Sequence, residues 1–149
     1  MAVVLRILRS AQLIENRLDA VASQHGLSHK GDLDVLTALR RVGAPNEQNP
    51  STLARGVQLT TGGMTNRLDR LEGAGLVNRR PDPEDRRGVL VELTEDGKRL
   101  VDRALDEVLA EQERLLASLP HQSRSAMADQ LEQLLMSLGD RAEELPLDD

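Results

Sequence analysis

The chain has 149 residues, with 19 Lys plus Arg against 25 Asp plus Glu and a formal net charge of −6. This length is typical of one domain with its own hydrophobic core. The absence of Cys excludes a disulfide framework, a thiolate nucleophile and a cysteine zinc site. The absence of Phe, Tyr and Trp disfavours RNA or single-strand binding through aromatic stacking.

The distribution of charge along the sequence is uneven. Residues 51–91 carry seven basic side chains, all Arg, and five acidic ones, whereas residues 104–149 carry three basic and eleven acidic side chains. Arginine suits bidentate contacts to phosphate and guanine. The overall acidity argues against DNA binding, so the assignment of function depends on motifs.

The amino-terminal part predicts two helices. A first helix follows from the apolar spacing of Val4, Ile7, Ala11, Ile14, Leu18 and Val21, and ends at Gly26. Ser28 is a candidate cap for a second helix that ends near Gly43. Residues 43–49 are expected to form a loop.

The central part predicts a helix-turn-helix followed by a hairpin. Asn49 and Pro50 open a short helix over residues 50–57, and Thr60 caps a second helix that runs to about residue 74. Residues 77–81 and 89–93 are expected to pair as two strands. A long helix from about residue 95 to 119 follows, and Pro120 separates it from a last amphipathic helix.

The second helix of the helix-turn-helix carries the side chains that could read a base sequence. In this motif the amino-terminal residues of the recognition helix meet base edges, and Asn pairs with adenine while Arg pairs with guanine. Gly62 and Gly63 either let the helix sit deep in the groove or belong to a frayed first turn. Arg67 and Arg70, taken alone, also fit a solvated helix face.

The hairpin between the two strands is rich in arginine and fits a wing that enters the minor groove. Its acidic residues Asp82, Glu84 and Asp85 would then be internal partners of the wing arginines. The alternative is an exposed hairpin whose charges neutralise one another.

Four motifs together resemble the MarR (multiple antibiotic resistance regulator) family: residues 49–54, 59–72, 75–77 and 80–94. The most specific motif is Asp85-x-Arg87, followed by Leu93-Thr94. The resemblance implies a mostly α fold with a small β wing, in which a winged helix-turn-helix domain is flanked by N- and C-terminal dimerisation helices. It predicts one chain over residues 1–149, with a DNA-binding lobe at 28–93 and a dimerisation lobe from 1–25 and 95–144.

The resemblance implies a sequence-specific, ligand-responsive repressor that binds an inverted-repeat operator on double-stranded DNA as a homodimer. Arg87 matches the wing arginine of the family, and Asp85 is its wing support. The candidate DNA-binding residues are Ser51, Thr52, Thr60, Thr61, Gly62, Gly63, Thr65, Asn66, Arg67, Arg70, Arg86 and Arg87.

Apolar stripes on the flanking helices would be exposed on a monomer, so we expect them to pack across a two-fold axis. The candidate dimerisation residues are Val4, Ile7, Ala11, Ile14, Leu115, Leu119, Met127, Leu131, Leu134 and Leu138. A small-molecule effector is a further expected partner, with no ligand-binding residues indicated. The lack of aromatic side chains disfavours a phenolic ligand held by stacking.

Other classes of function have weaker support in the sequence. The three histidines have no metal-binding spacing and there is no nucleophile or phosphate-loop motif, so we expect no enzyme, metal or cofactor. No apolar run approaches the roughly 18 residues of a membrane span, and we expect a cytoplasmic protein without a membrane partner. The alternative function is a winged-helix protein-interaction module or antirepressor that no longer binds DNA, which the acidic tail favours.

Overall fold

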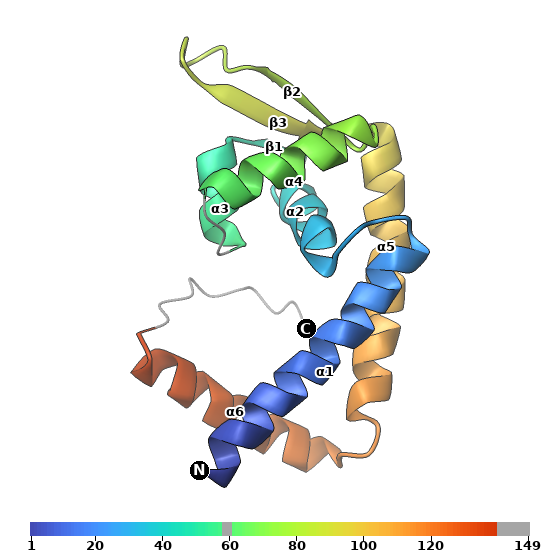
Figure 1. Ribbon diagram of the computed structural model, residues 1–149, viewed down its shortest axis with the longest axis vertical. Coiled ribbons are helices and arrows are strands. Elements are labelled where there is room, and N and C mark those ends of the chain that lie inside the picture. The colour runs from blue at the N-terminus through green and yellow to red at the C-terminus, as the bar shows by residue number, and fades with distance from the viewer. Residues whose placement is uncertain (58–60, 140–149) are drawn as a thin grey trace. The chain divides into compact units, whose positions relative to one another are not determined.

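The computed structural model describes residues 1–57 and 61–139. Figure 1 shows a mostly helical chain with a small sheet, as the sequence predicts. Its elements are α1 (Ala2–Gln24), α2 (Lys30–Arg41), β1 (Glu47–Gln48), α3 (Pro50–Gly56), α4 (Thr61–Gly73), β2 (Val77–Pro81), β3 (Val89–Leu93), α5 (Glu95–Leu116) and α6 (His121–Ser137). They fall into two compact units, one over Met1–Glu111 and a second that begins at Gln112.

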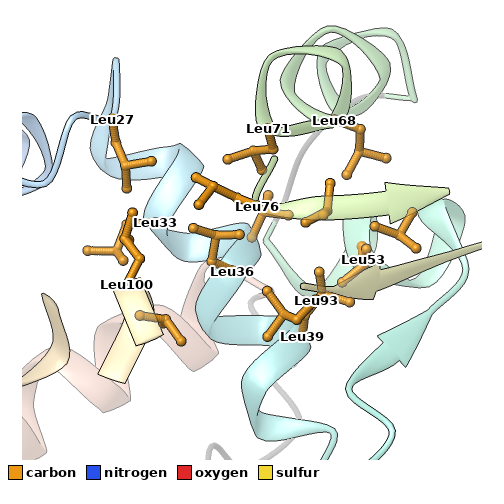
Figure 2. Close-up of a cluster of buried hydrophobic side chains, with 14 of the residues drawn as sticks. Leu27, Leu33, Leu36, Leu39, Leu53, Leu68, Leu71, Leu76, Leu93 and Leu100 are labelled. Atoms are coloured by element: carbon orange, nitrogen blue, oxygen red, sulfur yellow. The ribbon is translucent and has the colours of Figure 1, made fainter. Parts of the chain in front are cut away.

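The core of the first unit joins the helix-turn-helix to the sheet. Leu36 and Leu39 of α2, Leu68 and Leu71 of α4, and Leu93 of β3 are each at most 2 % exposed. Figure 2 shows these leucines converging between the helices and the strands. Because side chains from these three elements share one core, the position of α4 is coupled to that of α2 and of the hairpin.

The sheet has three strands in the order β1-β3-β2, all antiparallel. Val77 lies opposite Leu93 and Pro81 opposite Val89, so the predicted hairpin is confirmed. The prediction of a loop over residues 43–49 is wrong in part, because Glu47 and Gln48 form β1 against β3.

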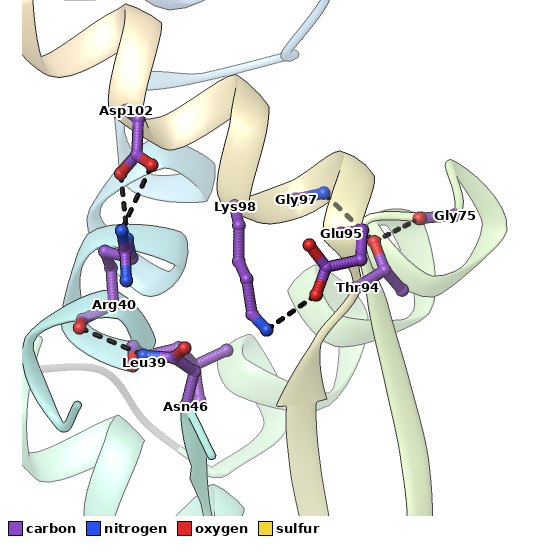
Figure 3. Close-up of polar contacts among 9 residues, drawn as sticks. All are labelled: Leu39, Arg40, Asn46, Gly75, Thr94, Glu95, Gly97, Lys98 and Asp102. Atoms are coloured by element: carbon purple, nitrogen blue, oxygen red, sulfur yellow. Dashed lines mark hydrogen bonds and ion pairs between the residues drawn. The ribbon is translucent and has the colours of Figure 1, made fainter. Parts of the chain in front are cut away.

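Asn46 explains why a strand forms in that short segment. The residue is 3 % exposed with a φ of 61°, and its side-chain Nδ2 donates to the carbonyl oxygens of Leu39 at 3.3 Å and Arg40 at 3.1 Å. Its own carbonyl accepts from the backbone N–H of Leu93 at 3.0 Å. Asn46 thus joins the end of α2 to β3, as Figure 3 shows in part.

The predicted helix starts have mixed outcomes. Asn49 caps α3, since its Oδ1 accepts from the backbone N–H of Thr52 at 2.9 Å. Ser28 does not cap α2, which starts at Lys30; the backbone N–H of Lys30 donates instead to Asp19 Oδ1 of α1 at 2.6 Å. The cap predicted at Thr60 lies outside the described residues.

Thr94 begins α5 at the end of the hairpin. Its hydroxyl accepts from the Gly97 N–H at 3.0 Å and donates to the Gly75 carbonyl at 2.7 Å (Figure 3). A Cβ on Gly97 would lie 2.2 Å from the Leu76 carbonyl oxygen, so only glycine allows this close approach. The start of α5 is therefore fixed to the turn between α4 and β2.

The second unit contains the end of α5 and α6. α5 ends at Leu116 and not near residue 119, because a turn with the bond from Leu119 N–H to the Leu116 carbonyl precedes Pro120. α6 starts directly after this proline. Arg124 of α6 holds the turn, donating to the Leu119 carbonyl at 3.0 Å and to Glu113 at 2.9 Å. Within the described residues no helix is long and apolar enough to cross a bilayer.

Candidate DNA-binding surface

The helix α4 has one buried face and one outward face. Met64, Leu68 and Leu71 are each 1 % exposed and pack on the core. The exposed positions recur at helical spacing on the opposite side: Gly62, Thr65, Asn66, Asp69, Arg70 and Gly73. The structure thus brings four predicted base-reading positions, Gly62, Thr65, Asn66 and Arg70, onto one face.

The amino-terminal turn of this helix leaves room for another molecule. A Cβ placed on Gly62 would meet no atom of the described protein within 4 Å. Packing inside the protein therefore gives no reason for glycine here, which agrees with close approach of an external surface. Gly63 lies in the same turn and is half-buried. Thr60 and the side chain of Thr61 lie outside what the structure describes.

The first helix of the motif adds polar groups beside this face. Ser51 is exposed and Thr52 is half-buried in the first turn of α3. The Thr52 hydroxyl accepts a bond of 3.3 Å from Arg55, an exposed arginine that the sequence analysis did not select. In helix-turn-helix proteins the first helix crosses the DNA backbone, which suits hydroxyl and guanidinium groups.

Arg67, a candidate DNA-binding residue, is half-buried beside the outward face of α4. Its side chain is 19 % exposed, and its Nε lies 3.5 Å from Oδ1 of Asp32, a carboxylate of α2 that is 3 % exposed. Arg70 Nη2 lies 2.8 Å from the same oxygen, and its side chain is 42 % exposed. The physical reason is the buried charge of Asp32, which requires a positive partner.

Gly31 makes room for this arrangement. A Cβ at residue 31 would lie 1.9 Å from Arg67 Nη1, so the guanidinium packs directly on the backbone of α2. Arg67 thus ties α4 to α2, and its contact with DNA stays a prediction. Arg70 is shared between Asp32 and solvent.

Two of the four wing arginines are held by acids. Arg79 Nη2 lies 2.6 Å from both Glu72 Oε2 and Asp69 Oδ1, and its backbone N–H donates to Glu72 Oε1 at 3.0 Å. Hydrogen bonding to Arg79 lowers the pKa of Glu72, and the same carboxylate raises the pKa of Arg79. Arg80 Nη2 lies 2.5 Å from Glu47 Oε2. These pairs fix the hairpin to α4 and β1.

Arg86 and Arg87 differ from Arg79 and Arg80 in their contacts. Both are exposed, and neither side chain has a hydrogen-bond or ion-pair partner among residues 1–57 and 61–139. They line an open hollow of about 360 Å³ on the hairpin together with Arg79, Arg80 and Val89. Two cations that pair with no group in the described part of the chain are thus available to an anionic ligand.

The wing acids support the hairpin differently from the prediction. Asp85 Oδ1 accepts from the backbone N–H of Arg87 at 3.0 Å, and the Asp85 carbonyl accepts from the Gly88 N–H at 2.8 Å. Asp82 Oδ1 likewise accepts from the Glu84 N–H at 2.8 Å. Asp85 therefore braces the backbone at Arg87 and leaves its guanidinium unpaired within the part of the chain described.

A pH experiment follows from the pair of Glu72 and Arg79. Because the folded-state pKa of Glu72 lies below 4.5, its contribution to stability is present above that pH and is lost as pH falls through the lowered value. We expect Glu72→Gln to reduce the acid-induced fall in Tm, measured by thermal unfolding at constant ionic strength. Glu84→Gln is the control, and an equal effect of both variants would contradict this role for Glu72.

The predicted dimerisation residues lie on both units. In the first unit Val4 is 60 % and Ile14 38 % exposed, Ala11 is exposed, and Ile7 is half-buried. In the second, Met127, Leu131, Leu134 and Leu138 are all at least 39 % exposed, whereas Leu115 and Leu119 are half-buried. These stripes leave apolar surface for a partner helix.

Comparisons with known proteins identify the family. The MarR family model matches residues 32–89. The transcriptional regulator PecS of Dickeya dadantii is 34 % identical over 125 residues, which span 84 % of this chain and 75 % of PecS.

Two crystal structures of the family are similar over almost the whole chain. Sco5413 of Streptomyces coelicolor, a MarR family transcriptional regulator, has a TM-score of 0.81 at 26 % identity and covers 96 % of this chain and 97 % of its own. A cysteine-to-serine mutant of MarR from E. coli, complexed with operator DNA, has a TM-score of 0.81 at 25 % identity and covers 91 % and 94 %. The chain therefore belongs to the MarR family and is a DNA-binding transcriptional regulator.

Proposed function

We propose that the protein is a repressor whose homodimer binds an inverted-repeat operator and releases it when a small-molecule effector binds. The observation that carries this proposal is the outward face of α4, which offers Thr65 and Asn66 beside a hairpin with two arginines that have no ion-pair partner among the described residues. Residues 28–93 would form the DNA-binding lobe, and residues 1–25 with 95–144 the dimerisation lobe. We infer that it acts in the cytoplasm on chromosomal DNA.

The proposed DNA contact of each residue follows from the chemistry of its side chain. Asn66 would read adenine through its amide, and Thr65 would contact a phosphate or a thymine methyl group. Ser51 and Thr52 would hold the DNA backbone at the start of α3. Arg86 and Arg87 would supply the charge that attracts the minor groove, where the potential is most negative.

The homodimer sets the form of the operator. Two copies of α4 related by a two-fold axis would meet successive major grooves about 34 Å apart, on half-sites about 10 bp apart. The apolar stripes on α1 and α6, including Val4, Ile14, Leu131 and Leu134, would be buried between copies. An effector that changes the distance between the recognition helices would then lower operator affinity.

Selection from a random duplex pool tests this function directly. Purified dimer would be incubated with the pool at about 150 mM salt, because salt sets the meaning of any DNA affinity, and bound fragments would be sequenced. We expect an enriched inverted repeat. No enrichment by a protein shown to be folded and dimeric would contradict sequence-specific binding and favour a protein-interaction module.

The role of Asn66 has its own expected result. Replacing it with Ala removes the amide that would pair with a base. We therefore expect the base preference to relax at one position in each half-site, with a loss of about 1–3 kcal/mol of discrimination between bases there. Repeating the selection with the variant measures this effect. Asn78→Ala, an exposed change on β2, is the control. Uniform weakening across all sequences would instead make Asn66 a phosphate contact.

A further inference from the structure

The outward face of α4 carries a carboxylate, Asp69, among the residues that would face DNA. It lies three and four residues after Asn66 and Thr65, one turn further along the same face. Its side chain is 55 % exposed. Duplex DNA is a dense array of negative phosphates, so a carboxylate here opposes binding to every sequence.

The charges around Asp69 do not cancel. Its Oδ1 lies 2.6 Å from Arg79 Nη2, but that arginine is also held by Glu72 through two nitrogens, at 2.6 Å and 2.9 Å. One guanidinium thus serves two carboxylates, and the cluster keeps one negative charge. The backbone N–H of Arg79 already donates to Glu72, so the hairpin remains attached without Asp69.

The arginine nearest in sequence does not neutralise this charge. Arg70 is directed to Asp32, where Nη2 and Oδ1 are 2.8 Å apart. The part of α4 that follows Asn66 therefore exposes the carboxylate of Asp69 next to Arg70, whose guanidinium is already paired with Asp32. A surface built only to attract phosphates would not carry this carboxylate.

We propose that Asp69 is a specificity-determining residue that penalises non-operator DNA. Against a random sequence its carboxylate meets phosphates and loses solvation. Against the operator it can accept a hydrogen bond from an amino group on a base edge, such as N4 of cytosine. The penalty is then offset only on the correct sequence, which raises the ratio of specific to non-specific affinity. This inference rests on the proposed function as an operator-binding protein.

Asp69→Asn tests the proposal because it removes the charge and keeps the shape and an oxygen acceptor for Arg79. Equilibrium binding of wild type and variant would be measured on a selected operator duplex and on a random duplex of equal length. We expect the variant to bind random DNA about fivefold more tightly, with a smaller increase in its affinity for the operator. The ratio of operator affinity to random-DNA affinity therefore falls. An unchanged Tm would show that the fold tolerates the change.

Asp96→Asn is the matched control, since Asp96 is an exposed aspartate on α5 that is also paired with one arginine. If Asp69→Asn and Asp96→Asn raise the affinity for both duplexes by the same factor, only the net charge of the protein matters and the proposal is wrong. If binding to both duplexes weakens together, Asp69 merely holds Arg79. If the wild-type protein prefers no duplex, the proposed function is wrong. That outcome is distinguishable from a failure of the Asp69 proposal, in which the wild type still prefers the operator.

Discussion

Replacing Arg87 with Ala is expected to weaken binding to every duplex by at least about tenfold at about 150 mM salt. Arg87 is exposed, has no ion-pair partner within the described residues, and its backbone is fixed by Asp85. It would neutralise a phosphate and release counterions. Because the proposed dimer carries two wings, the slope of log affinity against log salt should fall by about 1.8. The measurement is a salt titration of duplex binding by fluorescence anisotropy.

Arg80→Ala is the matched control for this prediction. Arg80 lies on the same hairpin and carries the same charge, but Glu47 at 2.5 Å and Glu92 at 3.7 Å already engage it. Its removal should leave the salt slope nearly unchanged. An equal loss of slope in both variants would show that internal pairing does not decide which arginine meets DNA. An unchanged slope for Arg87→Ala would remove the wing from the interface.

Elements with strong local signals could be predicted from the sequence. Asn49 followed by Pro50 is a cap and first-turn pair that needs no distant partner, and α3 begins there. The alternation of Val89, Val91 and Leu93 predicted β3 with its observed bounds. In both cases the residues that cause the structure lie within the element or directly before it.

Features that depend on distant residues could not be predicted in this way. Ser28 is a good cap by type, but α1 supplies Asp19 to the start of α2 instead. Strand β1 exists because Asn46 bonds to the end of α2 and β3 pairs with Glu47, and neither contact leaves a periodic pattern. Two-residue strands are too short for alternation to be visible.

The wing arginines show the same limit within the candidate site. Residue type alone does not separate the four, and Arg86 and Arg87 were selected with the family resemblance. Only the structure shows that Arg79 and Arg80 pair with acids from α4 and β1, which Arg86 and Arg87 do not. Arg67 and Asp32 are 35 positions apart, and an acid in the first turn of a helix is ordinarily explained by the helix dipole. Only the packing of α4 on α2 reveals Asp32 as the buried partner of two arginines.

That buried carboxylate carries the prediction with the largest effect on stability. Asp32→Ala leaves the Arg67 guanidinium, 19 % exposed and pressed on Gly31, without its counter-charge. Breaking one side of a buried pair costs about 3–5 kcal/mol, so we expect a loss near the lower end, because Arg70 can turn to solvent. Urea unfolding at fixed protein concentration measures this, since the proposed dimer would make stability depend on concentration.

A double variant separates the lost pairing from lost packing. Adding Arg67→Met to Asp32→Ala removes the stranded charge and should restore part of the stability, because apolar replacements of a buried pair are often neutral. Asp102→Ala, which breaks the more exposed pair with Arg40, should cost much less, because solvent screens exposed ion pairs. If Asp32→Ala costs no more than Asp102→Ala, the carboxylate does not hold α4. A large loss of stability with weakened operator selectivity would instead make Asp32 the residue that sets the recognition helix in place.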